Sequence, residues 1–165
     1  MDTQQLRDVL KRDLGPAFGG VYPRDVIPEL LPHHKAIVVN TDPHDRPGAH
    51  WVCLYLSSPT VEYFDSYGLP PDHKDIQDFI QRHGETWTHN THCYQDLNTD
   101  VCGQYCVYFL HQRHRHRSTV QEWLLPWKGT ALQRDRFVAD WFKETYRKPR
   151  THQGQTCQCQ RLNVL

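Results

Sequence analysis

Four residues of this 165-residue chain have side chains suited to nucleophilic chemistry on a carbonyl carbon. Cys102 stands where an apolar helix is expected to begin, and the unpaired N–H groups and dipole of a helix start lower a thiol's pKa. His50 could accept the thiol proton, and Asp65 could hold the imidazole in the required tautomer. The side-chain amide of Gln95 and the Cys102 backbone N–H could both donate to an oxyanion. The alternative is that Cys102 is an inert core thiol, because free cysteines are usually buried.

The expected helix follows a polar, turn-forming stretch. Residues 105–110, Tyr-Cys-Val-Tyr-Phe-Leu, are apolar without interruption, which is typical of a buried element. Asn98 and Asp100 are good N-cap residues just upstream, and Gly103 permits close backbone packing. The sequence therefore predicts a central buried helix that starts near Cys102.

His50 and Asp65 lie at the open end of a predicted β-hairpin. If Leu56 faces Val61, His50 lies opposite Tyr67 and diagonal to Asp65, within side-chain reach. A slip of one residue would separate His50 and Asp65 onto opposite faces, and a slip of two would pair them directly. The hairpin thus allows a His–Asp contact without requiring it. Two strand-like runs joined by a four-residue loop, Ser-Ser-Pro-Thr, define this hairpin: residues 51–56 and 61–65.

Further helices and strands are expected around the hairpin. They are a first helix capped by Thr3 and stopped by Gly15, a buried strand over 36–40, a helix from Asp72 to Gly84, a strand over 86–88, and a last long helix that stops before Lys148. One face of that last helix should carry Leu132, Phe137, Val138, Trp141 and Phe142. A capping box, Thr119 with Glu122, precedes the apolar residues 123–125. Residues 18–28, with two glycines and two prolines, are predicted to form an irregular loop.

Length and composition predict one domain over residues 1–146 and a polar, disordered tail over 147–165. The formal net charge is zero, which argues against a molecule built as a whole to bind nucleic acid. We find no apolar run long enough to span a membrane and no signal-peptide pattern, so neither membrane contact nor secretion is expected. The six cysteines are spread over expected strand, helix and tail, which indicates reduced thiols inside a cell.

The order of the four residues, together with their local contexts, resembles the adenovirus protease (adenain) family and the wider clan that includes the SUMO-deconjugating proteases. The seven-residue step from Gln95 to Cys102 is similar to the viral spacing. The resemblance covers roughly residues 3–146 and is closest to the proteases of Polinton/Maverick elements and adintovirus-type viruses. Three motifs carry it: Pro-Gly-Ala-His-Trp over 47–51, Tyr-Phe-Asp-Ser-Tyr-Gly over 63–68, and Cys-Gly-Gln-Tyr-Cys over 102–106.

The resemblance implies an α+β, papain-like (adenain-like) cysteine protease fold. In that fold a central mixed β-sheet packs against a buried helix that carries the nucleophile at its N-terminus, and other helices flank it. The implied catalytic residues are Cys102 as nucleophile, His50 as base, Asp65 as its partner and Gln95 as oxyanion donor. The implied function is a cysteine endopeptidase that cleaves precursor polypeptides of a viral capsid or core after small residues such as Gly, during particle maturation.

The resemblance also implies a monomer that works in the nucleus or cytoplasm of the host cell and is packaged in the virion. The sequence itself requires no cofactor. DNA or a viral peptide is implied as an activator, and DNA could contact the basic runs at 113–117 and 147–150, for which solvated surface is the alternative. Cys93 is the one cysteine near the region where such a peptide would attach, and its context differs from the family's.

Other functions are also considered. A SUMO-type modifier protease is the alternative within the same chemistry. A metal-binding or structural protein is suggested by twelve histidines, by His111, His114 and His116, and by Cys157 with Cys159. However, no two of these units combine into a four-ligand set with the usual zinc spacing. An inactive relative kept as a binding module is a third alternative, although none of the four key residues is replaced.

Overall fold

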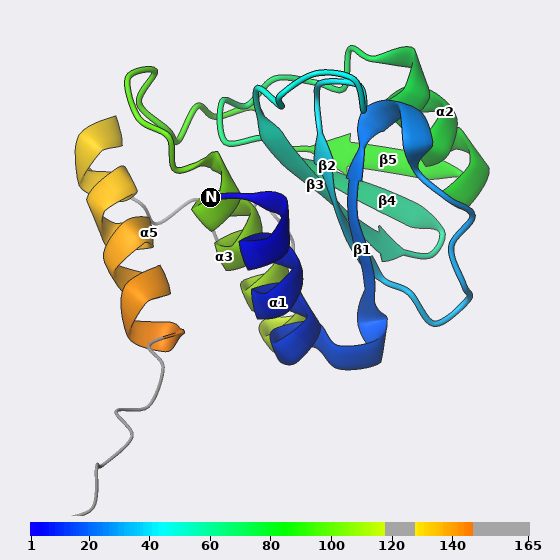
Figure 1. Cartoon of the computed structure of the whole chain (residues 1–165), viewed down its shortest axis with the longest axis horizontal. Helices are drawn as coiled ribbons and strands as arrows, with labels where there is room; N and C mark the ends of the chain where they lie inside the picture. Colours follow the sequence, from blue (N-terminus) through cyan, green and yellow to red (C-terminus); the bar gives the residue numbers. More distant parts are fainter. Residues whose placement is uncertain (118–127, 147–165) are drawn as a thin grey trace, which may run out of the picture.

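A five-stranded mixed sheet forms the centre of the computed structural model, which describes residues 1–117 and 128–146 (Figure 1). The strands lie side by side in chain order: β1 (Phe18–Pro23), β2 (Ala36–Asn40), β3 (Trp51–Ser57), β4 (Thr60–Phe64) and β5 (Thr86–His89). The three central strands pair antiparallel, whereas β1 pairs with β2 and β5 with β4 in parallel.

Helices cover both faces of this sheet. The long helices α1 (Thr3–Leu14), α3 (Cys102–His116) and α5 (Ala131–Thr145) lie on one side, with α3 between α1 and α5 (Figure 1). The shorter α2 (Lys74–His83) packs on the other side, and two 3-10 turns, Gly15–Ala17 and Arg24–Val26, flank β1. Strand β2 is buried along its whole length because both of its faces are covered, which explains its unbroken apolar sequence.

The hairpin that positions the candidate site has the register considered from the sequence. Leu56 pairs with Val61, and the pairing continues to Cys53 opposite Phe64. The predicted four-residue loop is wrong, because Ser57 and Thr60 also pair and leave only Ser58 and Pro59 between the strands. The register therefore brings His50 and Asp65 to the same end of the sheet.

Strand β1 corrects the prediction of an irregular loop over residues 18–28. Its backbone pairs with β2 despite its two glycines, with a register shift between Phe18 and Gly20. A Cβ on Gly19 would lie 2.9 Å from Ile37 Cγ2, so the missing side chain is what lets this segment approach its neighbour. A glycine that signals a loop in sequence here serves close packing instead.

Several helix boundaries and faces differ from the predictions. The N-cap of α1 is Asp2, not Thr3, because Asp2 Oδ1 accepts the Gln5 N–H at 2.8 Å and completes a capping box. Helix α2 starts at Lys74, two residues after the predicted Asp72. On α5, Leu132 and Phe137 are 49% and 50% exposed, so they lie outside the buried stripe, which contains Asp135 and Val138.

The capping box at Thr119 and the tail over 147–165 lie outside the described residues. Among the residues that are described, no helix is both long and apolar enough to cross a membrane.

Candidate active site

The start of α3 presents Cys102 without a capping side chain. Val101 occupies the N-cap position and makes no side-chain hydrogen bond, so the predicted caps Asn98 and Asp100 are wrong. A capping side chain would accept the N–H of the second or third helical residue. In this helix the N–H of Gly103, the second residue, instead helps to lower the pKa of the Cys102 thiol. The missing cap thus leaves helix-start donors for the sulfur.

His50 lies between Asp65 and Cys102. The His50 Nε2 atom is 2.8 Å from Asp65 Oδ1, and the two side chains are 16% and 5% exposed. The ring also hydrogen-bonds with the Cys102 thiol. Since Nε2 faces the carboxylate, Nδ1 is the ring nitrogen that remains for the sulfur. The structure therefore joins three of the four residues predicted for the site.

The contacts of His50 favour a charged pair. Burial opposes a charge on His50, but the hydrogen bonds to Asp65 and Cys102 outweigh it and raise the pKa of His50 to about 9. Burial also opposes a Cys102 thiolate, yet the bond to His50 and the Trp51 N–H hold the pKa of Cys102 below its ordinary value. Both shifts favour an imidazolium beside a thiolate, the form in which a cysteine is nucleophilic.

The Trp51 backbone fixes β3 against α3 beside this pair. Its N–H donates to the Cys102 sulfur, and its carbonyl accepts from Cys106 Sγ at 3.4 Å. The two cysteines are one helical turn apart, so both bonds hold the strand to the same side of the helix. Cys106 is fully buried, and this burial raises the pKa of its thiol well above the ordinary value. Cys106 is thus a structural core thiol, the alternative role that a buried cysteine can have.

Tyr67 and Asn90 help to hold Asp65 in place. The Tyr67 backbone N–H donates to Asp65 Oδ1 at 2.9 Å, and the Tyr67 ring stacks on His50 with 4.8 Å between ring centroids. The buried Asn90 side chain accepts from the Asp65 N–H at 3.0 Å and donates to the Asp65 carbonyl at 2.6 Å. Both the carboxylate and the imidazole are therefore fixed before any substrate binds.

Gln95 is a buried residue, only 1% exposed, in the segment that leads to α3. Its Oε1 accepts from Ser66 Oγ at 2.7 Å, and its Nε2 donates to the Thr99 carbonyl at 2.5 Å. The Gln95 backbone N–H also donates to the Ser66 carbonyl at 3.1 Å. An amide N–H2 carries two hydrogens, so the bond to Thr99 leaves the second for an oxyanion. Ser66 follows Asp65 directly, which connects the amide to the acid.

Four residues that were not predicted from the sequence hold the predicted ones in place: Asn90, Ser66, Thr99 and Asp135. The position of Asp135 could have been predicted, because it lies three residues before Val138 and therefore on the apolar face of the same helix. A carboxylate on the inward face of a helix needs polar partners. Asn90 and Ser66 gave no signal, because their partners are backbone groups and an amide far away in sequence.

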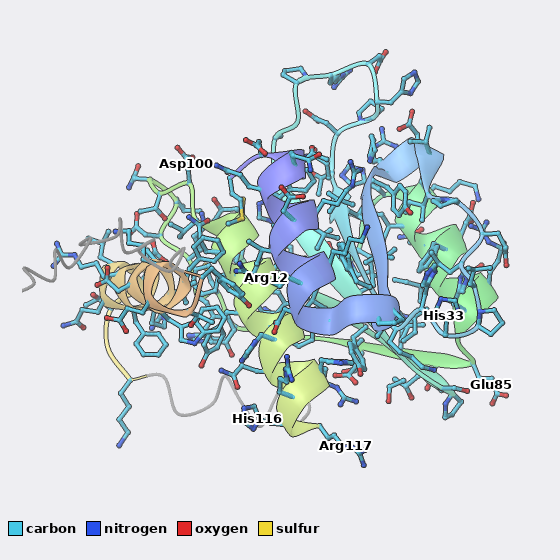
Figure 2. All side chains as sticks on the ribbon, turned by 60° about the horizontal axis from the view of Figure 1, so that its bottom comes forward. Arg12, His33, Glu85, Asp100, His116 and Arg117 are labelled. Atoms are coloured by element: carbon cyan, nitrogen blue, oxygen red, sulfur yellow. The ribbon has the colours of Figure 1, made fainter. Side chains whose placement is uncertain are left out.

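The basic run 113–117 lies at the opposite end of α3 from Cys102, where Figure 2 shows His116 and Arg117. Solvated surface is the wrong interpretation for Arg113, which is 9% exposed and bonds Glu62 Oε1 through Nε at 2.7 Å. Arg115 pairs with Asp13, and only part of the run remains open to a partner. Residues 147–150 lie outside the described part of the chain.

In the cluster of His111, His114 and His116, the first histidine has a structural role. His111 Nδ1 is 2.7 Å from Asp13 Oδ2, which joins α3 to α1. Within residues 1–117 and 128–146, no cluster of three or more His, Cys, Asp or Glu side chains could hold a metal ion. Cys157 and Cys159 are outside those ranges.

Similarity to known proteins is confined to the fold. No protein-family model and no curated protein matches the chain. The effector Cdu1 of Chlamydia trachomatis, solved bound to ubiquitin, superposes with a TM-score of 0.51 at 16% identity, over 86% of this chain and 77% of that one. ChlaDub1 of Chlamydia trachomatis gives a TM-score of 0.50 at 16% identity, over 68% of this chain and 61% of that one.

An ASFV protease gives a TM-score of 0.46 at 21% identity, over 64% of this chain, and the chain spans only 43% of that protein. This likeness is too distant to carry an argument. The predicted fold class is confirmed: the structure is α+β, with a five-stranded mixed sheet and the papain-like, Ulp1-type cysteine protease fold. At such low identities, likeness to these structures establishes the fold alone. The activity has to be inferred from the residues of the site.

Proposed function

We propose that this chain is a cysteine endopeptidase in which Cys102 is the nucleophile and His50 the general base. The observation that carries the proposal is the placement of the His50 ring between the Asp65 carboxylate and the Cys102 thiol, at the uncapped start of a buried helix. A thiol that is only part of a core needs neither a cationic partner nor open helix-start donors.

The geometry supports an acyl-enzyme mechanism. The Cys102 thiolate attacks the scissile carbonyl carbon, and the resulting oxyanion accepts from the Cys102 backbone N–H and the Gln95 amide. The imidazolium of His50 gives its proton to the leaving amine as the C–N bond breaks, which forms the thioester. His50 then takes a proton from water, whose oxygen attacks the thioester; collapse of the intermediate releases the acid and the Cys102 thiolate, which restores the thiolate–imidazolium pair. Asp65 stabilises the imidazolium in both halves.

The substrates proposed are precursor polypeptides of a virus or virus-like element, cut after small residues such as Gly. Support comes from the resemblance of the motifs around His50, Asp65 and Cys102 to adenain-like proteases of Polinton/Maverick and adintovirus type. By the same resemblance the enzyme works as a monomer in the host nucleus or cytoplasm, is packaged in the virion, and responds to DNA or a viral peptide.

A second candidate is a protease that removes ubiquitin or a ubiquitin-like modifier. One observation favours it: the neighbour with the TM-score of 0.51 was solved bound to ubiquitin and aligns with 86% of this chain. Both candidates use the same chemistry and cut after small residues. They differ in the substrate that carries the scissile bond, which is a precursor polypeptide in one case and a folded modifier in the other.

The deciding experiment is labelling with a peptide that ends in Gly-Gly and carries a thiol-directed electrophile. We expect adduct formation at Cys102 in the parent and in Cys93→Ala, and its loss in Cys102→Ala and His50→Ala. Cys93→Ala is the matched control, because Cys93 is the more exposed thiol. Adducts at Cys93 or Cys106 that persist in His50→Ala would contradict the proposal.

The same electrophile attached to the C-terminus of ubiquitin and of SUMO separates the two candidates. If the free Gly-Gly peptide reacts at least as fast as either modifier, endopeptidase action on precursors is supported. A reaction at least tenfold faster with one modifier would favour the second candidate, since docking energy from a folded partner would then add to the rate.

A further inference from the structure

One buried carboxylate of helix α5, that of Asp135, hydrogen-bonds the segment that carries Gln95. Asp135 is 4% exposed and lies on the α5 face that packs toward α3. Its Oδ2 accepts from the Asp96 N–H at 3.1 Å and from Thr99 Oγ1 at 2.6 Å, and its Oδ1 accepts from the Tyr105 hydroxyl at 2.8 Å. Three donors therefore converge on one carboxylate, two of them from the turn that begins just after Gln95.

Bonds to both ends of that turn fix its shape. Asp96 and Thr99 are the first and last residues of a tight turn in which the Thr99 N–H donates to the Asp96 carbonyl at 3.2 Å. Because Asp135 holds both residues, the direction of the Thr99 carbonyl is set from α5. That carbonyl in turn accepts from Gln95 Nε2 at 2.5 Å.

The neighbouring residue on α5 holds the other side of the same segment. Arg134 Nε donates to the Tyr94 carbonyl at 3.1 Å, and its terminal nitrogen donates to the Cys93 carbonyl at 3.2 Å. The backbone before and after Gln95 is thus bound to adjacent residues of one helix. Ser66 completes the arrangement from the sheet side, through the Gln95 Oε1 atom.

We infer that Asp135 is a positioning residue for the oxyanion site and acts through Thr99 on the side-chain amide of Gln95. The inference rests on the proposed function, because it assumes that the amide donates to an oxyanion. A carboxylate suits this task, since both of its oxygens accept and hydrogen bonds to a charged acceptor are stronger than neutral ones. In this arrangement the last described helix sets the catalytic geometry through Asp135.

Two kinetic readouts separate positioning from general structural damage. Peptide hydrolysis passes through a tetrahedral oxyanion, whereas alkylation of a thiolate by iodoacetamide is a direct displacement at carbon with no such intermediate. Loss of an oxyanion donor costs roughly 100- to 1000-fold in kcat, so a misdirected donor should cost at least about tenfold. For Asp135→Asn we expect that fall in kcat on a Gly-Gly anilide peptide, with KM and the alkylation rate of Cys102 nearly unchanged.

Variants of Thr99 and Asp140 complete the design. Thr99→Val removes the hydroxyl at nearly constant volume and should reproduce the fall in kcat, whereas Thr99→Ser keeps the hydroxyl and should restore it. Asp140→Asn is the matched control, an exposed carboxylate on the same helix whose side chain is 68% exposed. If Asp135→Asn and Thr99→Val keep the parent kcat, the inference is wrong. It is equally wrong if alkylation falls in proportion to kcat, because the damage is then general.

A spectroscopic readout keeps this test separate from that of the proposed function. The NMR signals of the Gln95 side-chain N–H2 report its bond to Thr99 whether or not the protein hydrolyses peptides. Shifted signals in Asp135→Asn and Thr99→Val, but not in Asp140→Asn, would support the relay even if the parent were inactive and the proposed function failed. Unchanged signals in both variants would overturn it.

Discussion

Asn90 bonds both backbone polar groups of Asp65: its side-chain oxygen accepts from the Asp65 N–H at 3.0 Å, and its side-chain nitrogen donates to the Asp65 carbonyl at 2.6 Å. These bonds follow the end of β4, where ladder pairing with β5 stops at Tyr63 and His89. The amide side chain therefore continues the sheet pairing for one more residue. That residue is the acid of the proposed triad, so its geometry depends on a side chain rather than on a strand.

Replacing Asn90 should cost both stability and activity. Asn90→Ala leaves the buried Asp65 N–H without its partner, whereas the Asp65 carbonyl keeps the Gly68 N–H at 2.9 Å. An unsatisfied buried group costs about 1–3 kcal/mol. We expect a fall of that size in the free energy of unfolding measured by urea titration, together with a lower kcat as Asp65 moves. Asn98→Ala, at an exposed position, should stay within about 0.5 kcal/mol of the parent. An Asn90→Ala protein as stable as the parent would contradict this role.

The His50 ring should give the enzyme an alkaline limit that Asp65 controls. The bonds to Asp65 and Cys102 overcome burial and raise the pKa of His50 to about 9, and the imidazolium is needed to protonate the leaving amine. Activity should therefore fall as the pH rises through about 9. Asp65→Asn removes the carboxylate charge, so the pKa of His50 drops and the limit should move to lower pH.

The measurement is the pH profile of kcat/KM for the parent and Asp65→Asn. Asp72→Asn is the control, since that carboxylate is 81% exposed and its contact is with His73. An alkaline limit that stays in place in Asp65→Asn would show that Asp65 does not set the charge of His50.

Selective alkylation offers a test that needs no substrate. Burial raises the pKa of the Cys93 thiol, whereas burial at Cys102 is outweighed by the bond to His50, which lowers the pKa there. Iodoacetamide near neutral pH should therefore modify Cys102 at least about tenfold faster than Cys93, although Cys93 is more exposed. Peptide mass mapping of briefly treated protein would show this order, and the preference should vanish in His50→Ala. Faster reaction at Cys93 would argue against an activated Cys102.

The sequence predicted the parts of the site that depend on local pattern. Hairpin register follows from pairing the apolar residues Leu56 and Val61, and that register alone brings His50 near Asp65 and Tyr67. The apolar run over 105–110 fits a buried strand or a buried helix equally well, and the helix was predicted because cap-type residues and Gly103 stand at its start. These features hold because each is determined by residues close together in the chain.

The missed features depend on contacts between distant segments. The uncapped start of α3 was missed because Asp100 has the right residue type for a cap, whereas Val101 occupies the N-cap position. Strand β1 was missed because a glycine such as Gly19 usually interrupts a strand. Its role in close packing against Ile37 is visible only in the folded structure. The link from Asp135 to Gln95 crosses about 40 residues, a distance over which local patterns carry no signal.

Asp13 provides a test of the scaffold at the far end of α3. It is a nearly buried carboxylate, with 6% of its side chain exposed, and it accepts from His111 Nδ1 at 2.7 Å and from the Tyr146 hydroxyl at 3.0 Å. Burial raises the pKa of Asp13, but the bonds and charge of His111 outweigh this and hold the pKa below its ordinary value of 3.8. One carboxylate thereby ties together α1, α3 and the end of α5.

The sign of the pH effect follows from that lowered pKa. A carboxylate that binds its proton less tightly in the folded state stabilises the fold above pH 3.8, and this contribution is lost as the pH falls further. Asp13→Asn should therefore lower the free energy of unfolding by about 1.5–3 kcal/mol at neutral pH, the scale of hydrogen bonds to a charged group. The difference from the parent should shrink as the pH drops below 3.8.

Urea titrations of the parent, Asp13→Asn and Asp8→Asn over this pH range provide the measurement. Asp8 is the matched control, an exposed carboxylate on the same helix that accepts from Gln4 Nε2 at 2.7 Å. Its substitution should have little effect at any pH. A deficit in Asp13→Asn that is the same at neutral pH and below pH 3.8 would mean that the side chain acts through its packing, because a charge-dependent tie must weaken once the carboxylate is protonated.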